Sequence, residues 1–363
     1  MGIGIQLDKI EIEGFKSIKL SDLELRPMNV LIGANGSGKS NLISLFNLLN
    51  QMVEGNFQLT VQKAGGADTF LYFGQKVTEE IRIKLTFGQN AYSCVLVPGE
   101  VDSLIFADEI CYFHDRSYPK PYAVPLSKAS RESKLPETAK KERVARCVLD
   151  SLKNWKVYHF HDTSESSHVK KTGDINDNLY LRSDAGNLAA FLYLLQKTAF
   201  THYEVIRNTI RLVAPFFDDF MLRPMPENEN KIRLEWRERG SDHPFLAHHL
   251  SDGTLRFMCL VTLLLQPKLP SMIVIDEPEL GLHPYAINVF ASLMRSASKR
   301  TQLIVSTQSV TLVNQFEAED LLVVDLKDHA TTIERVDPER LAEWLEDYAL
   351  GDLWEKNILG GRP

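Results

Sequence analysis

The first thirty residues alternate between apolar and polar positions. Apolar side chains recur among charged neighbours, at Leu7, Ile10, Ile12, Ile18, Leu20, Leu23 and Leu25. This period of two is typical of half-buried strands, so we expect two or three short strands joined by polar turns. An apolar run at 29–33 predicts a buried strand, and apolar residues from Leu42 to Leu49 then fall at helical spacing. Strand, glycine-rich turn and helix make one half of an α/β unit.

The pattern changes twice farther along the chain. From about 57 to 111 it indicates strands again, most clearly at 81–87 and 92–97. Between 112 and 245 it predicts helices at 187–196 and 203–212, without a sustained heptad repeat. After Leu250 strands and helices alternate, with strands expected at 271–275, 302–306 and 321–325 and helices at 255–265 and 284–294.

These patterns predict an α/β fold with a mixed sheet around the glycine-rich turn, an antiparallel β subdomain and an inserted, mainly helical lobe. We expect four segments. They are a first half of the main domain (1–111), the inserted lobe (112–245), a second half of the main domain (246–330) and a helical tail (331–363).

Composition narrows the class of protein. The 363 residues are 44% hydrophobic and 25% charged, which suits a soluble globular chain. The net charge of −7 does not favour nucleic-acid binding overall, although a local basic face would be compatible with it. The four cysteines form no CxxC pair and suggest reduced thiols. Without a signal peptide, or an apolar run near the roughly 18 residues of a membrane span, we expect a cytoplasmic protein.

A phosphate-binding motif lies between the buried strand and the helix. Residues Gly33-Ala-Asn-Gly-Ser-Gly-Lys-Ser40 fit the pattern G-x-x-x-x-G-K-[ST] in full. Its glycines let backbone N–H groups turn toward phosphate oxygens, Lys39 should reach the β- and γ-phosphates, and Ser40 should ligate Mg²⁺. The flanking elements make a chance glycine-rich turn a remote alternative. The expected nucleotide contacts are Asn35, Gly36, Ser37, Gly38, Lys39, Ser40 and Asn41, with ATP and Mg²⁺ as ligands.

An acidic pair follows another buried strand. Four apolar residues precede Asp276 and Glu277. Asp276 would hold Mg²⁺ through water, and Glu277 would be the base that deprotonates the attacking water. Alone, the pair could also be an N-terminal cap of the helix expected at Pro284, but a phosphate loop in the same chain favours catalysis.

Two shorter segments distinguish classes of phosphate-loop protein. Leu250-Ser-Asp-Gly-Thr254 opens a helix and resembles the LSGG-type signature of ABC ATPases in its SMC/RecF form, although such a string alone is more often a helix cap. The segment 279–283 resembles the D-loop of that class. Ser251 and Gly253 suit a γ-phosphate approached from outside, and the chain's own phosphate loop already fills its own site. They should therefore serve a partner chain.

Gln308 follows the next strand, where this class usually carries histidine. A glutamine can donate a hydrogen bond to the γ-phosphate but cannot carry a proton charge. We therefore expect glutamine in place of histidine to affect the rate of ATP hydrolysis rather than ATP binding.

In this order and spacing the motifs resemble the SMC/RecF-like ABC-type ATPases of the AAA_21 (AAA family ATPase) group, related to the ATPase half of OLD-type proteins. The resemblance covers 1–110 and 245–330, and 12–17 is similar to the opening of that group. It implies a P-loop ABC-type ATPase head and a homodimer with ATP between two heads. In it Lys39, Ser40, Asp276, Glu277 and Gln308 of one chain face Ser251 and Gly253 of the other.

The resemblance also implies a role in bacterial DNA repair or antiphage defence. The lack of heptads argues against a chromosome-bridging SMC protein. Too few residues follow Asp325 for the nuclease domain of OLD proteins, so a separate effector or nuclease is the expected partner. The alternative is a nucleotide-gated scaffold with little hydrolysis that holds an effector protein.

Two further features are weighed against ordinary structural roles. The basic run 127–146 could contact DNA, but interleaved glutamates favour a solvated helix face. His159, His161 and Asp162 could bind a metal, because alternation places both histidines on one strand face. With no second ligand cluster at suggestive spacing, a polar face or a lobe contact is favoured.

Overall fold

The computed structural model describes residues 6–362. The chain forms two compact units. The first comprises the chain up to Val157, Pro270–Val274, and the chain from Thr301 onward; the second comprises Tyr158–Leu269 and Ile275–Arg300. The expectation that no signal peptide is present rests partly on residues 1–5, which lie outside the described residues.

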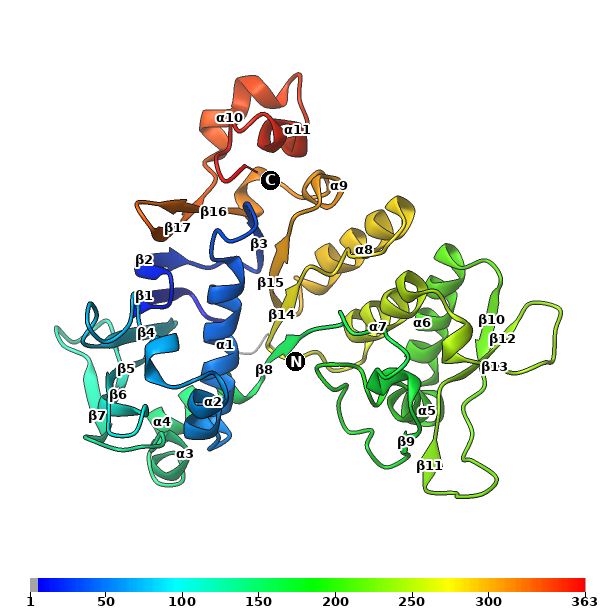
Figure 1. Cartoon of the computed structure of the whole chain (residues 1–363), viewed down its shortest axis with the longest axis horizontal. Helices are drawn as coiled ribbons and strands as arrows, with labels where there is room; N and C mark the ends of the chain where they lie inside the picture. Colours follow the sequence, from blue (N-terminus) through cyan, green and yellow to red (C-terminus); the bar gives the residue numbers. More distant parts are fainter. Residues whose placement is uncertain (1–5, 363) are drawn as a thin grey trace. The chain divides into compact units, whose positions relative to one another are not determined.

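The elements of the first unit are labelled in Figure 1. Its strands are β1 (Lys9–Phe15), β2 (Ile18–Glu24), β3 (Met28–Ile32), β4 (Ile81–Phe87), β5 (Asn90–Pro98), β6 (Leu104–Phe113), β7 (Tyr122–Ser127), β8 (Trp155–Tyr158), β14 (Met272–Asp276), β15 (Gln302–Thr307), β16 (Leu321–Lys327) and β17 (Ala330–Arg335). Its helices are α1 (Lys39–Val53), α2 (Phe57–Lys63), α3 (Leu135–Thr138), α4 (Arg143–Lys153), α9 (Val310–Val313), α10 (Pro338–Leu345) and α11 (Leu350–Glu355). The final residues of β8 and β14 cross into the second unit.

Two six-stranded sheets build this unit. One is antiparallel in the order β2-β1-β4-β5-β6-β7, and the other is mixed in the order β17-β16-β3-β15-β14-β8. In the mixed sheet β3 is parallel to both β15 and β16, whereas β17 returns antiparallel to β16. The predicted α/β class, the mixed sheet and the antiparallel β subdomain are therefore confirmed.

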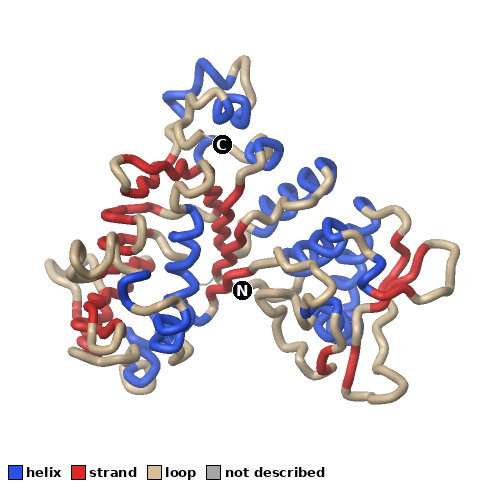
Figure 2. The backbone as a smooth tube through the Cα atoms, viewed as in Figure 1, coloured by secondary structure: helices blue, strands red, loops and turns tan. Residues whose placement is uncertain are grey.

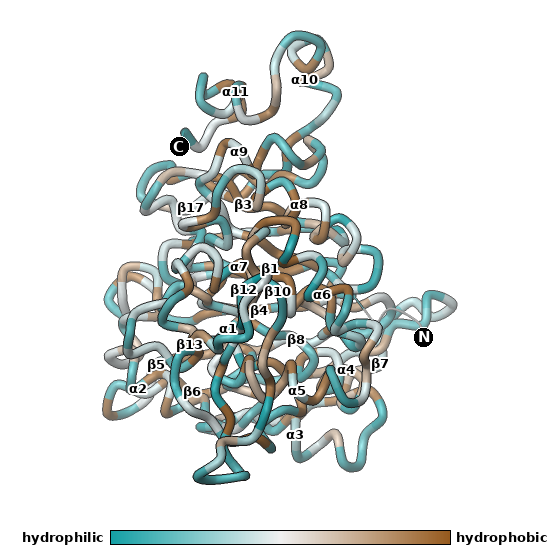
Figure 3. Tube along the Cα trace, turned by 90° about the vertical axis from the view of Figure 1, so that its right-hand side faces the viewer, coloured by the Kyte–Doolittle hydropathy of each residue, from teal (hydrophilic) through white to brown (hydrophobic). Residues whose placement is uncertain are grey.

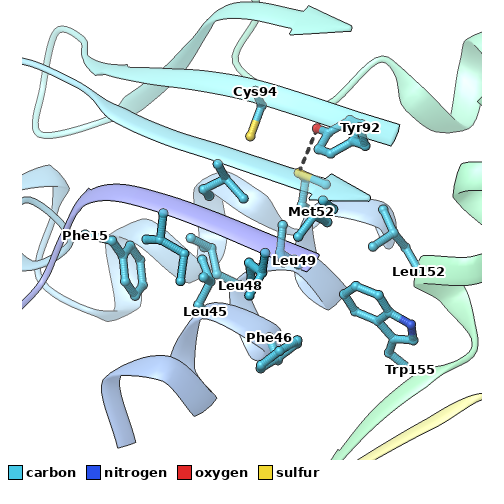
Figure 4. Close-up of a cluster of buried hydrophobic side chains, with 14 of the residues drawn as sticks. Phe15, Leu45, Phe46, Leu48, Leu49, Met52, Tyr92, Cys94, Leu152 and Trp155 are labelled. Atoms are coloured by element: carbon cyan, nitrogen blue, oxygen red, sulfur yellow. Dashed lines mark hydrogen bonds between the residues drawn. The ribbon is translucent and has the colours of Figure 1, made fainter. Parts of the chain in front are cut away.

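Helix α1 is anchored by the core of the first unit. Its apolar positions Leu42, Leu45, Phe46 and Leu49 are at most 1% exposed, as the helical spacing predicted. Figure 4 shows Leu45, Leu48 and Leu49 among the buried side chains beneath the antiparallel sheet. The rings of Phe46 and Trp155 make an edge-to-face contact, with 5.7 Å between their centroids. This burial fixes the helix that begins at the phosphate loop.

The prediction of strands throughout 57–111 is wrong at its start, where α2 forms instead. The Glu132 carboxylate accepts hydrogen bonds from the backbone N–H groups of Phe57 (3.1 Å) and Gln58 (2.9 Å). A carboxylate at a helix N-terminus satisfies free N–H groups and complements the helix dipole. Because the cap comes from a distant residue, local periodicity gives no sign of it.

The segment 112–157, which the sequence assigned to the inserted lobe, belongs to the first unit. Strand β6 continues to Phe113, β7 pairs with it, and α4 packs against β5 and β6. The basic run 127–146 is divided among the end of β7, α3 and the start of α4. Arg146 of this run has a structural role, because its side chain donates hydrogen bonds to the backbone carbonyls of Ala139 and Lys140.

The region after 330 also differs from the helical tail that was expected. It begins with β17 and becomes helical only at α10 and α11. Residues 330–335 form the second strand of a hairpin with β16, because each of them pairs across the ladder.

Glu109 is a fully buried carboxylate between β6 and the loop before α3. It accepts hydrogen bonds from Tyr92 Oη (2.9 Å), Lys134 N (2.9 Å), and the hydroxyls of Ser127 and Ser133. Removing an acceptor leaves its buried donors unsatisfied, which is more costly than the net gain of the bonds.

We therefore expect Glu109→Leu to lower the free energy of unfolding by about 3 kcal/mol, measured by urea denaturation. Glu100→Leu makes the same replacement at an exposed position in the turn between β5 and β6, and should leave the free energy of unfolding nearly unchanged. Equal losses in the two variants would contradict a structural role for the Glu109 network.

The second unit combines helices with short strands, as Figure 2 shows. Its helices are α5 (Leu188–Thr198), α6 (Phe200–Val213), α7 (Asp252–Leu265) and α8 (Pro284–Ala297). Its strands are β9 (Gly173–Asp174), β10 (Phe217–Phe220), β11 (Lys231–Ile232), β12 (Glu235–Glu238) and β13 (Phe245–Leu246). Helix α7 packs between α6 and α8, and its residues 255–264 are all buried. The four helices predicted here are confirmed.

Two further features of the chain are the state of its cysteines and the apolar character of its helices. All four cysteines are free, and burial raises the pKa of Cys111 and Cys259 to about 12. Within residues 6–362, no helix combines the length and apolar character needed to cross a bilayer.

Candidate nucleotide-binding site

The phosphate loop leaves β3 and enters α1 through a tightly enclosed turn. Gly38 is the N-cap of α1 at φ 108, in the left-handed region that favours glycine. A Cβ there would lie 2.1 Å from Thr331 Oγ1, and one on Gly33 would lie 2.1 Å from the Val324 carbonyl oxygen. The β16–β17 hairpin therefore backs the loop so closely that neither position accepts a side chain.

Lys39 lies inside this loop rather than in solvent. It is 5% exposed, and its ammonium donates to the carbonyl oxygens of Gly33 (2.6 Å) and Ala34 (3.0 Å). The ammonium thus lies at the start of the loop. Asn35, Gly36 and Ser40 are exposed, so the outer rim of the loop is accessible.

Two residues that the motif did not identify hold the loop from behind. Thr331 Oγ1 donates to the Ser37 carbonyl (2.8 Å) and lies 2.6 Å from Ser17 Oγ, which accepts from Asn41 Nδ2 (2.6 Å). Asn41 therefore supports the loop. Ser17 belongs to the opening segment already noted in the sequence, whereas Thr331 carries no sequence signal.

Gln308 lies at the same edge of the mixed sheet as the phosphate loop. Strand β15 pairs in parallel with β3, and Thr307 is opposite Ile32. Gln308 follows β15 directly and Gly33 follows β3 directly, so the two segments leave the sheet side by side. Ser309 then caps α9 by accepting from Leu312 N (3.2 Å). The first unit thus brings together the loop and Gln308.

The acidic pair ends β14, the neighbour of β15 in the strand order. Glu277 has φ 41, a left-handed conformation that is strained for a residue with a side chain. Asp276 Oδ1 is buried and has no hydrogen-bond partner in the described part of the chain. An unpartnered buried carboxylate oxygen is costly, so it fits a position that a bound cation or its water would satisfy.

His159 and His161 follow β8 rather than lying on it, so the prediction of a shared strand face is wrong. The His161 Nε2–H donates to the Asp276 carbonyl (2.7 Å). Burial lowers the pKa of His159, with a further lowering by His161 and an opposing effect of Asp276. Across residues 6–362, no group of three or more His, Cys, Asp and Glu side chains could hold a metal ion.

The segment 250–254 opens α7 in the second unit. Ser251 is the N-cap, and its Oγ accepts from Thr254 N (3.2 Å). A Cβ on Gly253 would lie 2.1 Å from the Gly281 carbonyl oxygen, so the 279–283 segment packs directly on the start of this helix.

Arg256 connects the same helix to the chain after β8. Its guanidinium donates to the carbonyls of Phe160 (2.8 Å) and His161 (3.2 Å), and burial lowers its pKa. Because His161 also donates to Asp276, one chain of contacts joins α7 to the acidic pair. Sequence patterns did not identify Arg256, since it falls within a continuous apolar run.

Comparisons with known proteins agree with this arrangement. Residues 28–314 match the family described as "AAA domain, putative AbiEii toxin, Type IV TA system". The Old nuclease of Escherichia phage P2 is 23% identical over 401 residues, covering 93% of this chain. This chain spans 62% of the length of that relative.

Two solved structures share the fold. The SMC head bound to the C-terminal winged-helix domain of ScpA has a TM-score of 0.56 at 15% identity, covering 93% of this chain and 99% of its own. The SMC head with an extended coiled coil, bound to the C-terminal domain of ScpA from Pyrococcus furiosus, has a TM-score of 0.52 at 16% identity. It covers 94% of this chain and 98% of its own. At these identities the likeness concerns the fold.

Proposed function

Because the chain belongs to the AAA_21 family of AAA-domain ATPases, we propose that it binds ATP with Mg²⁺ and hydrolyses it between two paired copies of itself. The observation that carries the proposal is the enclosed phosphate loop, with buried Lys39 inside it and Gln308 beside it. Backbone N–H groups at a helix N-terminus and one lysine are what a triphosphate requires. The relation to an OLD nuclease and the SMC-head fold support the same reading.

Each residue of the site then has a distinct task. Lys39 would exchange its carbonyl partners for the β- and γ-phosphates, and Gln308 would donate to the γ-phosphate. By their sequence motifs, Ser40 and Asp276 would be the ligands of a magnesium ion, which would neutralise the phosphate oxygens when bound. The unpartnered Asp276 Oδ1 supports this role for Asp276. Glu277 would accept the proton of the attacking water, and its strained backbone is consistent with a position fixed by function.

The start of α7 would contact ATP held by the partner chain. Ser251, Gly253 and the helix dipole favour an anion, whereas Asp252 places a negative charge beside it. Lys170 offsets that charge, since its ammonium is 3.6 Å from Asp252 Oδ1 and its side chain is only 7% exposed. In the signature segment (residues 250–254), the charge of Asp252, which stands where LSGG has no charged residue, is thereby balanced by Lys170.

The Gly253 contact gives a test of pairing that is separate from ATP binding. In Gly253→Ala the new methyl group displaces the 279–283 segment from α7. We expect ATP-dependent dimers and turnover to fall about tenfold, because a small misplacement of a catalytic surface has such an effect. ATP affinity should change less than about twofold, since the phosphate loop is on other elements.

Gly173→Ala is the matched control, because a Cβ there meets no atom closer than 4.0 Å. Dimerisation can be followed by light scattering with and without ATP. Unchanged dimerisation and turnover in Gly253→Ala would exclude the proposed role of the signature segment.

The proposed biological role is a switch in bacterial DNA repair or antiphage defence that acts with a separate effector or nuclease. The similarity to the Old nuclease of Escherichia phage P2 supports it. ATP turnover should be measured alone, with double-stranded DNA and with single-stranded DNA. Turnover that rises with DNA supports a nucleic-acid-responsive ATPase.

A second candidate is a nucleotide-gated scaffold that holds an effector and hydrolyses little ATP. Gln308 favours it, because an uncharged amide stabilises the developing charge less than a protonated histidine does. Tight ATP binding with negligible turnover under all three conditions would support the scaffold and contradict the ATPase.

A further inference from the structure

The segment Leu350–Gly361 lies against the helix that follows Gln308. Helix α11 packs on α9, which begins two residues after Gln308. The Gly351 N–H donates to Asn314 Oδ1 (2.6 Å), and a Cβ on Gly351 would lie 2.6 Å from Val310 Cγ1. Figures 1 and 3 show α11 beside α9 from two directions. One end of the segment is thus in close contact with residues 308–314, which comprise Gln308, Ser309, α9 and Asn314 and are called the Gln308 loop.

The other end of the segment lies against the phosphate loop. After α11 the chain turns back, and Gly361 adopts φ 56. A Cβ on Gly361 would lie 2.8 Å from Val323 Cγ1, 3.1 Å from the Val324 carbonyl oxygen and 3.4 Å from the Cα of Gly33. The backbone of Gly361 therefore packs on the first glycine of the phosphate loop.

The two ends are joined by a buried tryptophan. Trp354 is fully buried, and its indole N–H donates to the Gly361 carbonyl (2.6 Å). The N–H groups of Asn357 and Ile358 donate to the carbonyls of Trp354 and Leu353, which closes the turn after α11. The segment is therefore a compact unit rather than a loose end.

We propose that Leu350–Gly361 is a positioning element that fixes the phosphate loop relative to the Gln308 loop. Lys39 donates to the carbonyl of Gly33, so a shift of Gly33 moves the cradle of the lysine. A shift of α9 moves Gln308, which lies two residues before the start of that helix. Both residues are expected at the γ-phosphate, so one rigid segment sets their separation. This inference rests on the proposed nucleotide site.

Adjacent glycines provide a matched pair of variants. Gly360 and Gly361 both have positive φ, so alanine brings backbone strain at either position. A Cβ on Gly360 meets no atom closer than 3.7 Å, whereas one on Gly361 presses on Val323 and approaches Gly33. A difference between the two variants therefore reports on the contact with the phosphate loop.

In Gly361→Ala we expect kcat/KM for ATP to fall about tenfold, with weaker binding of Mg-ATP in an equilibrium titration. In Gly360→Ala, kcat/KM and the affinity for Mg-ATP should stay within about twofold of the values for the unchanged protein. Measurements are made well below the melting temperature of each variant. Trp354→Phe retains the buried ring but removes the donor to Gly361, and should also weaken Mg-ATP binding.

The double variant Gly361→Ala with Val323→Ala removes the methyl group nearest to the new side chain and should recover part of the lost turnover. Equal effects of Gly360→Ala and Gly361→Ala, or unaltered binding in Trp354→Phe, would overturn the positioning role. If the unchanged protein fails to bind Mg-ATP, the proposed function itself is wrong, and the two failures are thereby distinguished.

Discussion

Lys39→Ala is expected to abolish measurable ATP turnover and to weaken Mg-ATP binding by at least about a hundredfold. The ammonium is the buried cation inside the phosphate loop, 2.6 Å from the Gly33 carbonyl oxygen. Alanine removes the positive charge that would face the β- and γ-phosphates and also the two hydrogen bonds that hold the loop. Binding can be measured by calorimetry and turnover by phosphate release.

A control distinguishes loss of this charge from loss of any lysine. Lys63→Ala removes an exposed lysine at the end of α2 in the same unit and should change neither quantity. Substantial binding by Lys39→Ala would place the nucleotide elsewhere in the chain and would refute the proposed site.

Glu277→Gln has the second largest expected effect, on turnover alone. The amide retains the size of the side chain but cannot accept the proton of the attacking water, so we expect turnover to fall by about a factor of 100 to 1,000. Mg-ATP binding should persist, and ATP-bound dimers should accumulate because the step that separates them is blocked. Light scattering with ATP measures the dimers, and phosphate release measures turnover.

The matched control is Glu229→Gln, which makes the same change at an exposed position of the second unit. It should behave like the unchanged protein. If Glu277→Gln also leaves turnover and the dimer fraction unaltered, Glu277 is not the base, and the scaffold function is favoured over the ATPase.

The local parts of the fold were predictable because their signals lie within a few residues. Alternation identified β1 and β2, an apolar run identified β3, and helical spacing identified α1. The phosphate loop followed from a motif placed between β3 and α1. The position of Gln308 beside Gly33 also follows from order, since parallel strands of an α/β sheet end at one edge.

The contacts that complete the site join residues far apart in sequence, and no local pattern encodes them. Thr331 reaches the Ser37 carbonyl across 294 positions, and Glu132 caps α2 across 75. Gly361 is one of several glycines near the end of the chain until the fold places it against Gly33. The histidines after β8 were misplaced because alternation continues beyond the last ladder pairing of the strand.

The position of β3 has a consequence for synthesis of the protein on the ribosome. This strand is among the first made, yet both of its partners, β15 and β16, come after residue 300. Closing such long loops precedes any stabilising contact, and nascent chains grow from the N-terminus. The phosphate motif therefore emerges early without the strands that enclose it. The antiparallel sheet of β2, β1, β4, β5, β6 and β7 can form first, and competence to bind nucleotide is a late event that awaits most of the chain.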